Sequence, residues 1–274
     1  MSGKLFVTGT PIGNLSDFSP RAIETMKNCD FIAAEDTRVT LKLLNHFEIK
    51  KPLVSYYEHN KTQREDEIIS RILNGEDCVL VSDAGMPAIS DPGMELVNAC
   101  HEHGIPVVAI PGPNAFATAL AISGMDNGRF TFEGFLSVTK KSRREHLSEI
   151  KNEKRTMIFY EAPHKLSYTL RDLHETLGDR KIAIVRELTK IHEEVIRTTL
   201  KQAVEDYPDN NLKGEIVLII EGAKEEEKEI TLEDAVEKAK DYISKGMSTN
   251  DAAKTAAHDT GLKKSDIYKA LQET

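Results

Sequence analysis

Short apolar runs that end in turn-forming residues constrain the fold of this chain more than any other feature of its sequence. Segments with apolar residues at helical spacing lie between them, at Arg21–Lys27, Arg64–Leu73 and Met94–His101. The apolar runs occupy Lys4–Thr8, Asp30–Ala34, Pro52–Tyr56, Cys78–Ser82 and Pro106–Ile110. Such an alternation is typical of a largely parallel sheet with both faces covered by helices. The sequence therefore predicts an α/β domain over residues 1–124.

A second α/β domain is predicted over residues 125–222, after the turn-rich stretch Gly124–Arg129. Its expected helices are Arg144–Ile150, Lys165–Leu177 and Gln202–Tyr207. Its expected strands are Arg129–Phe135, Thr156–Tyr160, Lys181–Val185, Val195–Leu200 and Glu215–Ile220. Several of these runs suit antiparallel edges, so the pattern leaves the topology of this sheet open.

Residues 229–274 are predicted to form a small helical module that follows the charged run Lys224–Glu229. Thr231–Asp234 and Ser248–Asp251 have the form of a capping box, in which side chains satisfy the first N–H groups of a helix. Gly261 then separates two short helical segments, which is the spacing of a helix-turn-helix.

Composition narrows the class of protein. A hydrophobic content of 39% is that of a folded globular chain, and no apolar run approaches the roughly 18 residues that span a bilayer. Cys29, Cys78 and Cys100 are widely spaced and odd in number, which argues against a disulfide framework. No secretory signal is visible at the amino terminus, so we expect a cytoplasmic protein. The net charge of −9 requires any nucleic-acid contact to come from a local basic patch.

The usual nucleotide and metal signatures are missing from the sequence. It contains no G-x-G-x-x-G, no G-x-x-x-x-G-K-[ST], no H-E-x-x-H and no G-x-S-x-G pattern. We therefore predict no metal site and no serine nucleophile.

Loops rich in glycine and proline follow three of the predicted strands. They are Thr8–Leu15, Ser82–Gly93 and Pro111–Ala115. Glycine lets a ligand approach the backbone and proline stiffens the loop, so these loops suit a rigid ligand cradle at the carboxyl ends of the strands. Each loop alone is equally well explained as a tight turn between a strand and a helix. Three in one domain favour a ligand rim.

The chain resembles the tetrapyrrole methylase superfamily and, within it, the bacterial ribosomal RNA small-subunit methyltransferase I family. The motifs that carry this resemblance, in order, are Gly9–Leu15, Ala34–Arg38, Val81–Gly93, Ile110–Ala115, Arg186–Lys190 with Glu193 and Glu194, and Gly214–Gly222. The resemblance extends from about residue 4 to residue 222, and the helical tail also fits the family.

The resemblance implies two α/β domains of the tetrapyrrole-methylase type, with S-adenosylmethionine bound in a cleft between them, and a homodimer. It also implies methyl transfer to the 2′-oxygen of a cytidine in 16S ribosomal RNA of the small (30S) subunit. The residues that match the cofactor site of the superfamily are Thr10, Pro11, Asp83, Met86, Asn114, Ala115, Tyr160, Glu161 and Ala162. Asp83 has an alternative role as a helix cap or turn former.

Two charged clusters are candidates for assisting the reaction, because a 2′-hydroxyl must lose its proton as it attacks the methyl carbon. The first holds Glu35, Asp36 and Arg38, which we expect on a loop just past a strand. The second holds Lys190 among Arg186, Glu187 and Glu193. An ion-pair network that holds loops together explains either cluster equally well, and no single base stands out.

Local features suited to RNA lie in three places. Basic residues at Lys140, Lys141, Arg143 and Arg144 open a helix and suit phosphates, although a basic run is often only a solvated face. Tyr56 and His59 offer stacking and edge contacts to bases, although paired tyrosines often pack in a core. Lys263 and Lys264 open the last helix of the tail, for which we expect a role in substrate recognition. A dimer-stabilising or simply packed bundle is the alternative for the tail.

Two other functions remain open at this level. A small-molecule, tetrapyrrole-type methylase would use the same scaffold but would have little use for the basic segment or the tail. A non-enzymatic nucleic-acid-binding regulator is suggested by the tail alone.

Overall fold

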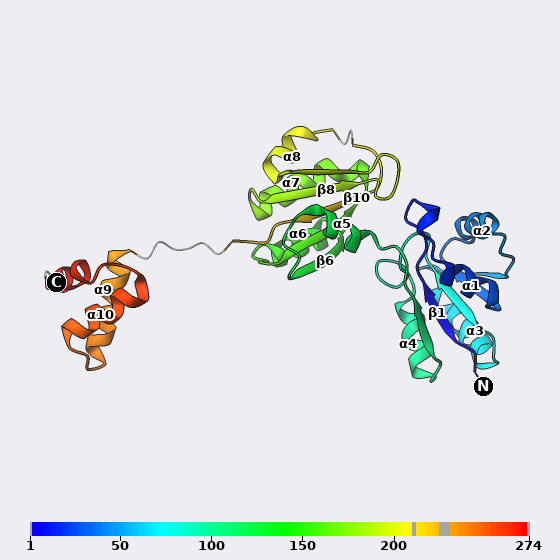
Figure 1. Cartoon of the computed structure of the whole chain (residues 1–274), viewed down its shortest axis with the longest axis horizontal. Coiled ribbons are helices and arrows are strands. Elements are labelled where there is room, and N and C mark those ends of the chain that lie inside the picture. Colours follow the sequence, from blue (N-terminus) through cyan, green and yellow to red (C-terminus); the bar gives the residue numbers. More distant parts are fainter. Residues whose placement is uncertain (1, 210–211, 225–230, 273–274) are drawn as a thin grey trace. The chain divides into compact units, whose positions relative to one another are not determined.

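The computed structural model describes residues 2–209, 212–224 and 231–272 of the chain (Figure 1). Two compact units are present, Met1–Ala223 and Lys224–Thr274, and each is described by itself. The first unit holds two five-stranded sheets, and the second is helical. The predicted boundaries at residues 124 and 229 stay predictions.

The first sheet is entirely parallel, as the sequence predicts. Its strands are β1 (Leu5–Thr8), β2 (Phe31–Ala34), β3 (Leu53–Ser55), β4 (Cys78–Val81) and β5 (Val107–Ile110), in the order β3-β2-β4-β1-β5. Each predicted apolar run contains its strand. Because all five strands run the same way, the loops that follow them meet at one edge of the sheet.

Helices cover both faces of this sheet (Figure 1). They are α1 (Pro20–Asn28) and α2 (Thr37–His46) on one face, and α3 (Lys61–Leu73) and α4 (Met94–Glu102) on the other. Along β2 the side chains alternate: Phe31 packs toward α3 and α4, and Ile32 packs toward α1 and α2. Burying each such side chain stabilises the fold by about 1.5–3 kcal/mol, which is why a continuous apolar run is needed here.

The second sheet is mixed. Its strands are β6 (Phe130–Phe135), β7 (Thr156–Glu161), β8 (Lys181–Arg186), β9 (Glu194–Thr199) and β10 (Ile216–Ile220), in the order β6-β7-β10-β8-β9. Only β6 and β7 pair in parallel; β10 runs antiparallel to both β7 and β8, and β9 runs antiparallel to β8. Antiparallel pairing, expected at edges, therefore reaches the centre of this sheet.

Helices also cover the second sheet. On one face lie α6 (Lys140–Ile150), α7 (Leu166–Leu177) and α8 (Leu200–Asp206). The other face packs against α5 (Ala115–Ser123), together with Ile12 and Leu188. Helix α5 precedes the predicted boundary at residue 124, so the chain reaches the second sheet before that residue.

The sequence analysis missed two helices. Helix α2 begins at Thr37, so Glu35 and Asp36 lie on the predicted loop after β2, whereas Arg38 lies in the first turn of the helix. Asp36 is its cap, with its carboxylate accepting from the Arg38 N–H at 2.8 Å. Helix α5 is alanine-rich and apolar on nearly every side, so it shows no helical period in the sequence.

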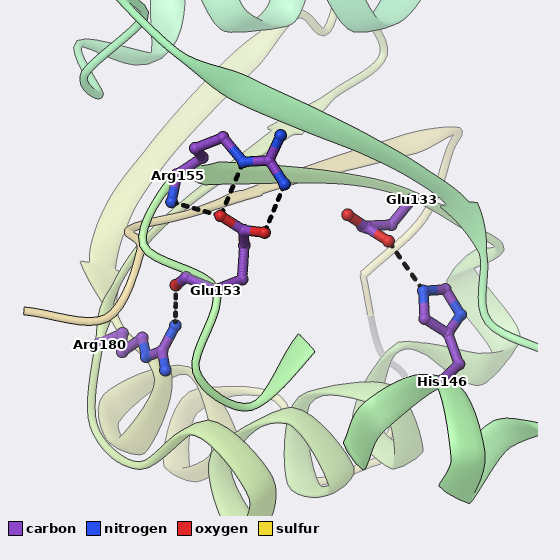
Figure 2. A network of polar contacts seen from close by, with 5 residues as sticks. All are labelled: Glu133, His146, Glu153, Arg155 and Arg180. Atoms are coloured by element: carbon purple, nitrogen blue, oxygen red, sulfur yellow. Dashed lines mark hydrogen bonds and ion pairs between the residues drawn. The ribbon is translucent and has the colours of Figure 1, made fainter. Parts of the chain in front are cut away.

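Helix α6 is fixed to its surroundings along its length. His146 on α6 lies 2.9 Å from the Glu133 carboxylate on β6, as Figure 2 shows. The loop after α6 is held by an ion pair between Arg155 and Glu153 (2.6 Å) and by the Arg180 guanidinium, which donates to the carbonyl of Glu153 (Figure 2). The basic segment that opens α6 therefore sits on a rigid support.

The helical unit consists of α9 (Leu232–Ser244), α10 (Thr249–Thr260) and α11 (Lys264–Gln272). Thr231 and Asp234 form the predicted capping box; Ser248 also caps its helix through the Asp251 N–H. Small alanine side chains from α9 and α10 pack around Ile267 of α11. The predicted helices and the turn at Gly261 are confirmed.

The three cysteines are free and buried, as expected from their spacing. Burial raises the pKa of the Cys29 and Cys100 thiols to about 11, which makes them poor nucleophiles. Within the described ranges, no helix is both long and apolar enough to cross a bilayer.

Candidate functional site

A cleft of about 410 Å³ lies where the carboxyl ends of the first-sheet strands meet the second sheet. From the first sheet, Glu35 follows β2, Asp83 follows β4 and Asn114 follows β5. From the second sheet come the ends of β6 and β7, with Phe135 and Tyr160. Carboxyl ends of parallel strands are where open α/β sheets bind ligands, so this cleft is the leading candidate site.

Most residues that match the superfamily's cofactor site come together in this cleft. Those that line it are Asp83, Met86, Asn114, Ala115, Tyr160, Glu161 and Ala162. Thr10 is buried, and its hydroxyl donates to the Ser82 carbonyl at 3.3 Å, so it supports the wall from behind. Pro11 lies between Thr10 and the lining residue Ile12.

Glycines hold two of the cleft loops together. A Cβ atom on Gly9 would lie 2.7 Å from the Gly112 Cα, and one on Gly112 would lie 2.8 Å from the Gly9 Cα. Such distances are prohibitive, so the loops after β1 and β5 touch backbone to backbone. Thr10 and Gly85 also exchange backbone hydrogen bonds at 2.9 and 3.1 Å, which ties in the loop after β4. The glycine-rich loops thus form one rigid rim.

The start of α5 is tied to the second sheet at the cleft. Asn114 caps the helix by accepting from the Ala117 N–H at 3.0 Å. The Tyr160 hydroxyl accepts from the Phe116 N–H at 3.2 Å, and burial raises the pKa of this phenol. Phe116 and Phe132 stack beside them with centroids 4.6 Å apart. This wall of the cleft is apolar and fixed.

Three carboxylates gather on the opposite wall. Glu35 accepts from the Asp83 N–H at 3.3 Å, and Asp83 in turn accepts from the Asp36 N–H at 3.1 Å. Burial raises the pKa of Glu35, Asp83 and Asp91, and repulsion from neighbouring carboxylates adds to the effect. Carboxyl groups with raised pKa values in a cleft are candidates for proton transfer.

Glu35 lines the cleft, whereas Asp36 and Arg38 are not among its lining residues. The Arg38 guanidinium binds the Asp36 carboxylate at 2.6 Å and, by this hydrogen bond, holds the pKa of Asp36 at about 2. The Arg38 side chain is itself 87% exposed. Asp36 therefore serves as an ionised helix cap, and a catalytic role for either residue stays a prediction.

Lys190 lies in an ion-pair network. Its ammonium binds Glu187 at 2.9 Å and Glu215 at 3.2 Å, and Glu215 lines the cleft. The aliphatic stem of Lys190 covers Gly13, where a Cβ atom would lie 2.6 Å from the Lys190 Cγ. These contacts fit the alternative that the cluster holds loops together, and catalysis by Lys190 stays a prediction.

A buried chain of hydrogen bonds links the basic segment of α6 to the cleft. The Arg143 guanidinium pairs with Asp172 and donates to the Thr169 hydroxyl at 2.8 Å. The Thr169 hydroxyl donates to the Glu161 carboxylate, which also accepts from the Ala162 N–H at 2.7 Å. The side chain of Arg143 is only 17% exposed, so it is oriented toward α7 and not toward solvent.

The other residues predicted to contact RNA differ in their exposure to solvent. Lys140, Lys141 and Arg144 are exposed on α6, and Lys263 and Lys264 are exposed at the start of α11. Tyr56 is only 1% exposed and packs in the core of the first sheet, so from this position it does not offer a face to a base. His59 is exposed, and its ring meets that of Tyr57, which is 41% exposed, at a centroid distance of 6.2 Å.

A second cavity of about 580 Å³ adjoins the cleft. Its wall contains Tyr57 and His59, and it shares Glu35, Ile89 and Asp91 with the cleft. Tyr57 belongs to the tyrosine pair that the sequence offered for base stacking, whereas Asp91 was not predicted as a site residue. Asp91 lies within the loop Ser82–Gly93, so its position in a glycine- and proline-rich loop was a usable signal.

The chain is similar in sequence to a family of known methylases. A family model described as Tetrapyrrole (Corrin/Porphyrin) Methylases matches residues 4–204. The chain is 50% identical over 270 residues to the ribosomal RNA small subunit methyltransferase I of Halalkalibacterium halodurans, with 97% of this chain and 93% of that protein covered. The protein of the same name from Thermotoga maritima is 46% identical over 220 residues, which are 99% of that protein but 80% of this chain.

Solved structures with the same fold are more distant in sequence. Uroporphyrin-III-C-methyltransferase from Thermus thermophilus has a TM-score of 0.57 and 16% identity, with 80% of this chain and 94% of that chain covered. The methyltransferase CobJ has a TM-score of 0.60 and 18% identity, with coverages of 81% and 95%. At these identities the likeness concerns the fold alone.

Proposed function

Because the chain belongs to the ribosomal RNA small subunit methyltransferase I family of the tetrapyrrole methylases, we propose that it methylates RNA of the small ribosomal subunit with S-adenosylmethionine as donor. The acceptor is the 2′-oxygen of a cytidine in 16S ribosomal RNA. The observation that carries the proposal is the cleft, into which seven of the nine residues that match the cofactor site converge. Such a reaction takes place in the cytoplasm, where the subunit is assembled.

The residues of the cleft fit the methyl donor. S-adenosylmethionine supplies a methyl group on a positively charged sulfur. Its hydroxyl and ammonium groups need acceptors, such as Asp83, and its adenine needs an apolar slot, such as the space beside Ala115 and Tyr160. Gly85, which also lines the cleft, has a φ of +85°, a left-handed backbone conformation that favours glycine.

The chemistry requires positioning and a proton acceptor. The ribose hydroxyl must lie in line with the methyl carbon, and the rigid glycine rim supplies the fixed geometry that this alignment needs. The carboxylates of Glu35, Asp83 and Asp91 stand on the wall of the cleft and are the candidate proton acceptors. Tyr160 lines the cleft and its ring packs against Phe132 at a centroid distance of 5.0 Å, so this side of the cleft is apolar.

RNA is expected to contact the exposed cations of α6 and of the helical unit. Lys140, Lys141 and Arg144 project from a helix that is fixed to the sheet, so they present charge at little entropic cost. Lys263 and Lys264 stand at the start of α11, where the helix dipole also favours phosphate.

A homodimer is part of the proposal. It rests on the family resemblance. Light scattering on the purified protein measures its mass in solution, and the mass of two chains is expected. A mass of about one chain would contradict the homodimer.

The experiment that tests the proposed function uses isolated small subunits that lack the modification. With methyl-labelled S-adenosylmethionine, we expect label in one 2′-O-methylcytidine, located by nuclease mapping of the ribosomal RNA. Label in a corrin or porphyrin, with none in RNA, would assign the chain to the small-molecule methylases. Absence of donor binding in calorimetry would instead favour a non-enzymatic RNA-binding protein.

A further inference from the structure

The two cavities beside Glu35 share one wall. The cleft that we assign to the methyl donor and the adjoining cavity of about 580 Å³ have Glu35, Ile89, Ser90 and Asp91 in common. In a methyl transfer, the donor and the acceptor must meet within bonding reach of each other. This inference rests on the proposed function. The accepting oxygen then comes from the second cavity and meets the methyl group at the shared wall.

The side chains of the second cavity suit a nucleoside without its phosphates. Tyr57 and His59 form one side, and Tyr57 has 41% of its surface exposed, which leaves an aromatic ring available for stacking. Ile89 and Met94 add exposed apolar surface, at 54% and 65%. The carboxylates at the shared wall repel phosphate but accept hydrogen bonds from hydroxyl and amino groups.

A nucleoside of a structured RNA reaches such a cavity when its base is taken out of the helical stack. Enzymes that modify nucleotides extrude the target into a pocket and hold it by stacking and by hydrogen bonds to its edges. The volume of the second cavity falls in the range of ordinary small-molecule sites. The phosphates on either side of the extruded nucleoside then remain outside, within reach of exposed cations.

We propose that the second cavity is the acceptor pocket for one extruded ribonucleoside, stacked on Tyr57, and that Asp91 is the catalytic residue that takes the proton of its ribose hydroxyl. Glu35 is assigned a positioning role, because one of its oxygens accepts from the Asp83 N–H at 3.3 Å and so links the segments that follow β2 and β4. Asp91 stands on the loop between the two cavities and contributes to the walls of both.

The proposed step balances in atoms and charge. The oxygen–carbon bond forms as the bond from the methyl carbon to the sulfonium breaks, and the electron pair of that bond stays on sulfur. The hydroxyl proton passes to the Asp91 carboxylate. The sulfonium becomes a neutral thioether and the carboxylate becomes a neutral acid, so that no net charge is created in the cleft.

The first test replaces Asp91 by asparagine, which keeps the shape and removes the base. We expect kcat for methylation of small subunits to fall at least about 100-fold, with the calorimetric Kd for S-adenosylmethionine within about twofold of the wild type. Burial raises the pKa of Asp91, so its ionised form opposes folding at neutral pH. The neutral amide therefore should not lower the melting temperature, which separates lost catalysis from lost folding.

The second test concerns the stacking platform. Tyr57→Ala should raise KM for small subunits about tenfold with little change in donor affinity, since a stacked base contributes about 1–3 kcal/mol. Tyr168→Ala is the matched control, because Tyr168 is also an exposed tyrosine, at 63%, and lies on α7 away from both cavities. Its kinetic constants should equal those of the wild type.

Distinct results overturn the proposal. If the wild type methylates subunits and the Asp91→Asn variant is equally active, Asp91 is not the base. If the Glu35→Gln variant is then inactive, that role belongs to Glu35. Loss of donor affinity in Tyr57→Ala would assign the second cavity to the donor. If the wild type itself does not methylate subunits, the proposed function fails, independently of these variants.

Discussion

Thr169 offers the sharpest test of how the cleft is held in place. Its hydroxyl, on a residue that is 1% exposed, donates to the buried Glu161 carboxylate and accepts from Arg143 at 2.8 Å. Thr169→Val removes this hydroxyl at nearly constant volume. The Glu161 carboxylate then loses the Thr169 donor while it stays buried, and hydrogen bonds to charged groups contribute about 1.5–3 kcal/mol each.

The expected loss of stability is therefore about 2–3 kcal/mol, or about 5–10 °C in the melting temperature of a unit of this size. Because Glu161 lines the cleft, affinity for S-adenosylmethionine should also fall several-fold. Differential scanning calorimetry and donor titration measure the two effects. Thr169→Ser, which restores the hydroxyl, should recover donor affinity even though it lacks the methyl group.

Thr131→Val is the matched control. Among the described residues, none lies within hydrogen-bonding distance of the buried Thr131 hydroxyl on β6. The same substitution there should leave stability unchanged or raise it, because no hydrogen bond is lost. Equal losses in the two valine variants, or none at Thr169, would refute the argument that the chain from Arg143 to Glu161 stabilises the cleft.

Three further outcomes are expected. Ala115→Leu should fill the slot and weaken donor binding at least about tenfold in a folded protein, and unchanged affinity in calorimetry would remove the start of α5 from the donor site. Charge reversal at Lys140, Lys141 and Arg144 should lower RNA affinity and reduce the salt slope by roughly one unit per lost contact; an unchanged slope would make them a solvated face. Truncation after Ala223 should preserve donor binding and weaken subunit binding, whereas conversion to monomers would assign the tail to dimer contacts.

Much of the fold follows from local sequence. The parallel strands of the first sheet are buried on both faces, so each must be continuously apolar, and the runs that contain β1 to β5 are visible without a structure. The carboxyl ends of these strands meet at one edge, which is why the glycine-rich loops after them were expected to form one rim. Capping at Thr231 is likewise a property of four consecutive residues.

Neighbouring residues of like type were separated only by the structure. Tyr56 and Tyr57 follow the same strand, but Tyr56 enters the core and Tyr57 lines the second cavity. On α6, Arg143 is buried against α7 while Arg144 is exposed. For Arg143 a signal was present, because it precedes the buried Leu147 by four residues and the buried Ile150 by seven, which are the spacings of one helix face.

The sequence by itself determined which segments form strands and which loops contain the candidate ligand-binding residues. Strands follow from local periodicity, and these loops follow from the backbone freedom of glycine. Only the tertiary structure decided that Asp91 and Glu35 line the same two adjoining cavities, and that Arg143 reaches Glu161 through Thr169. These contacts join residues that are distant in the chain. They depend on the order of strands and on helix packing, which arise from the burial of many apolar side chains at once and not from any one segment.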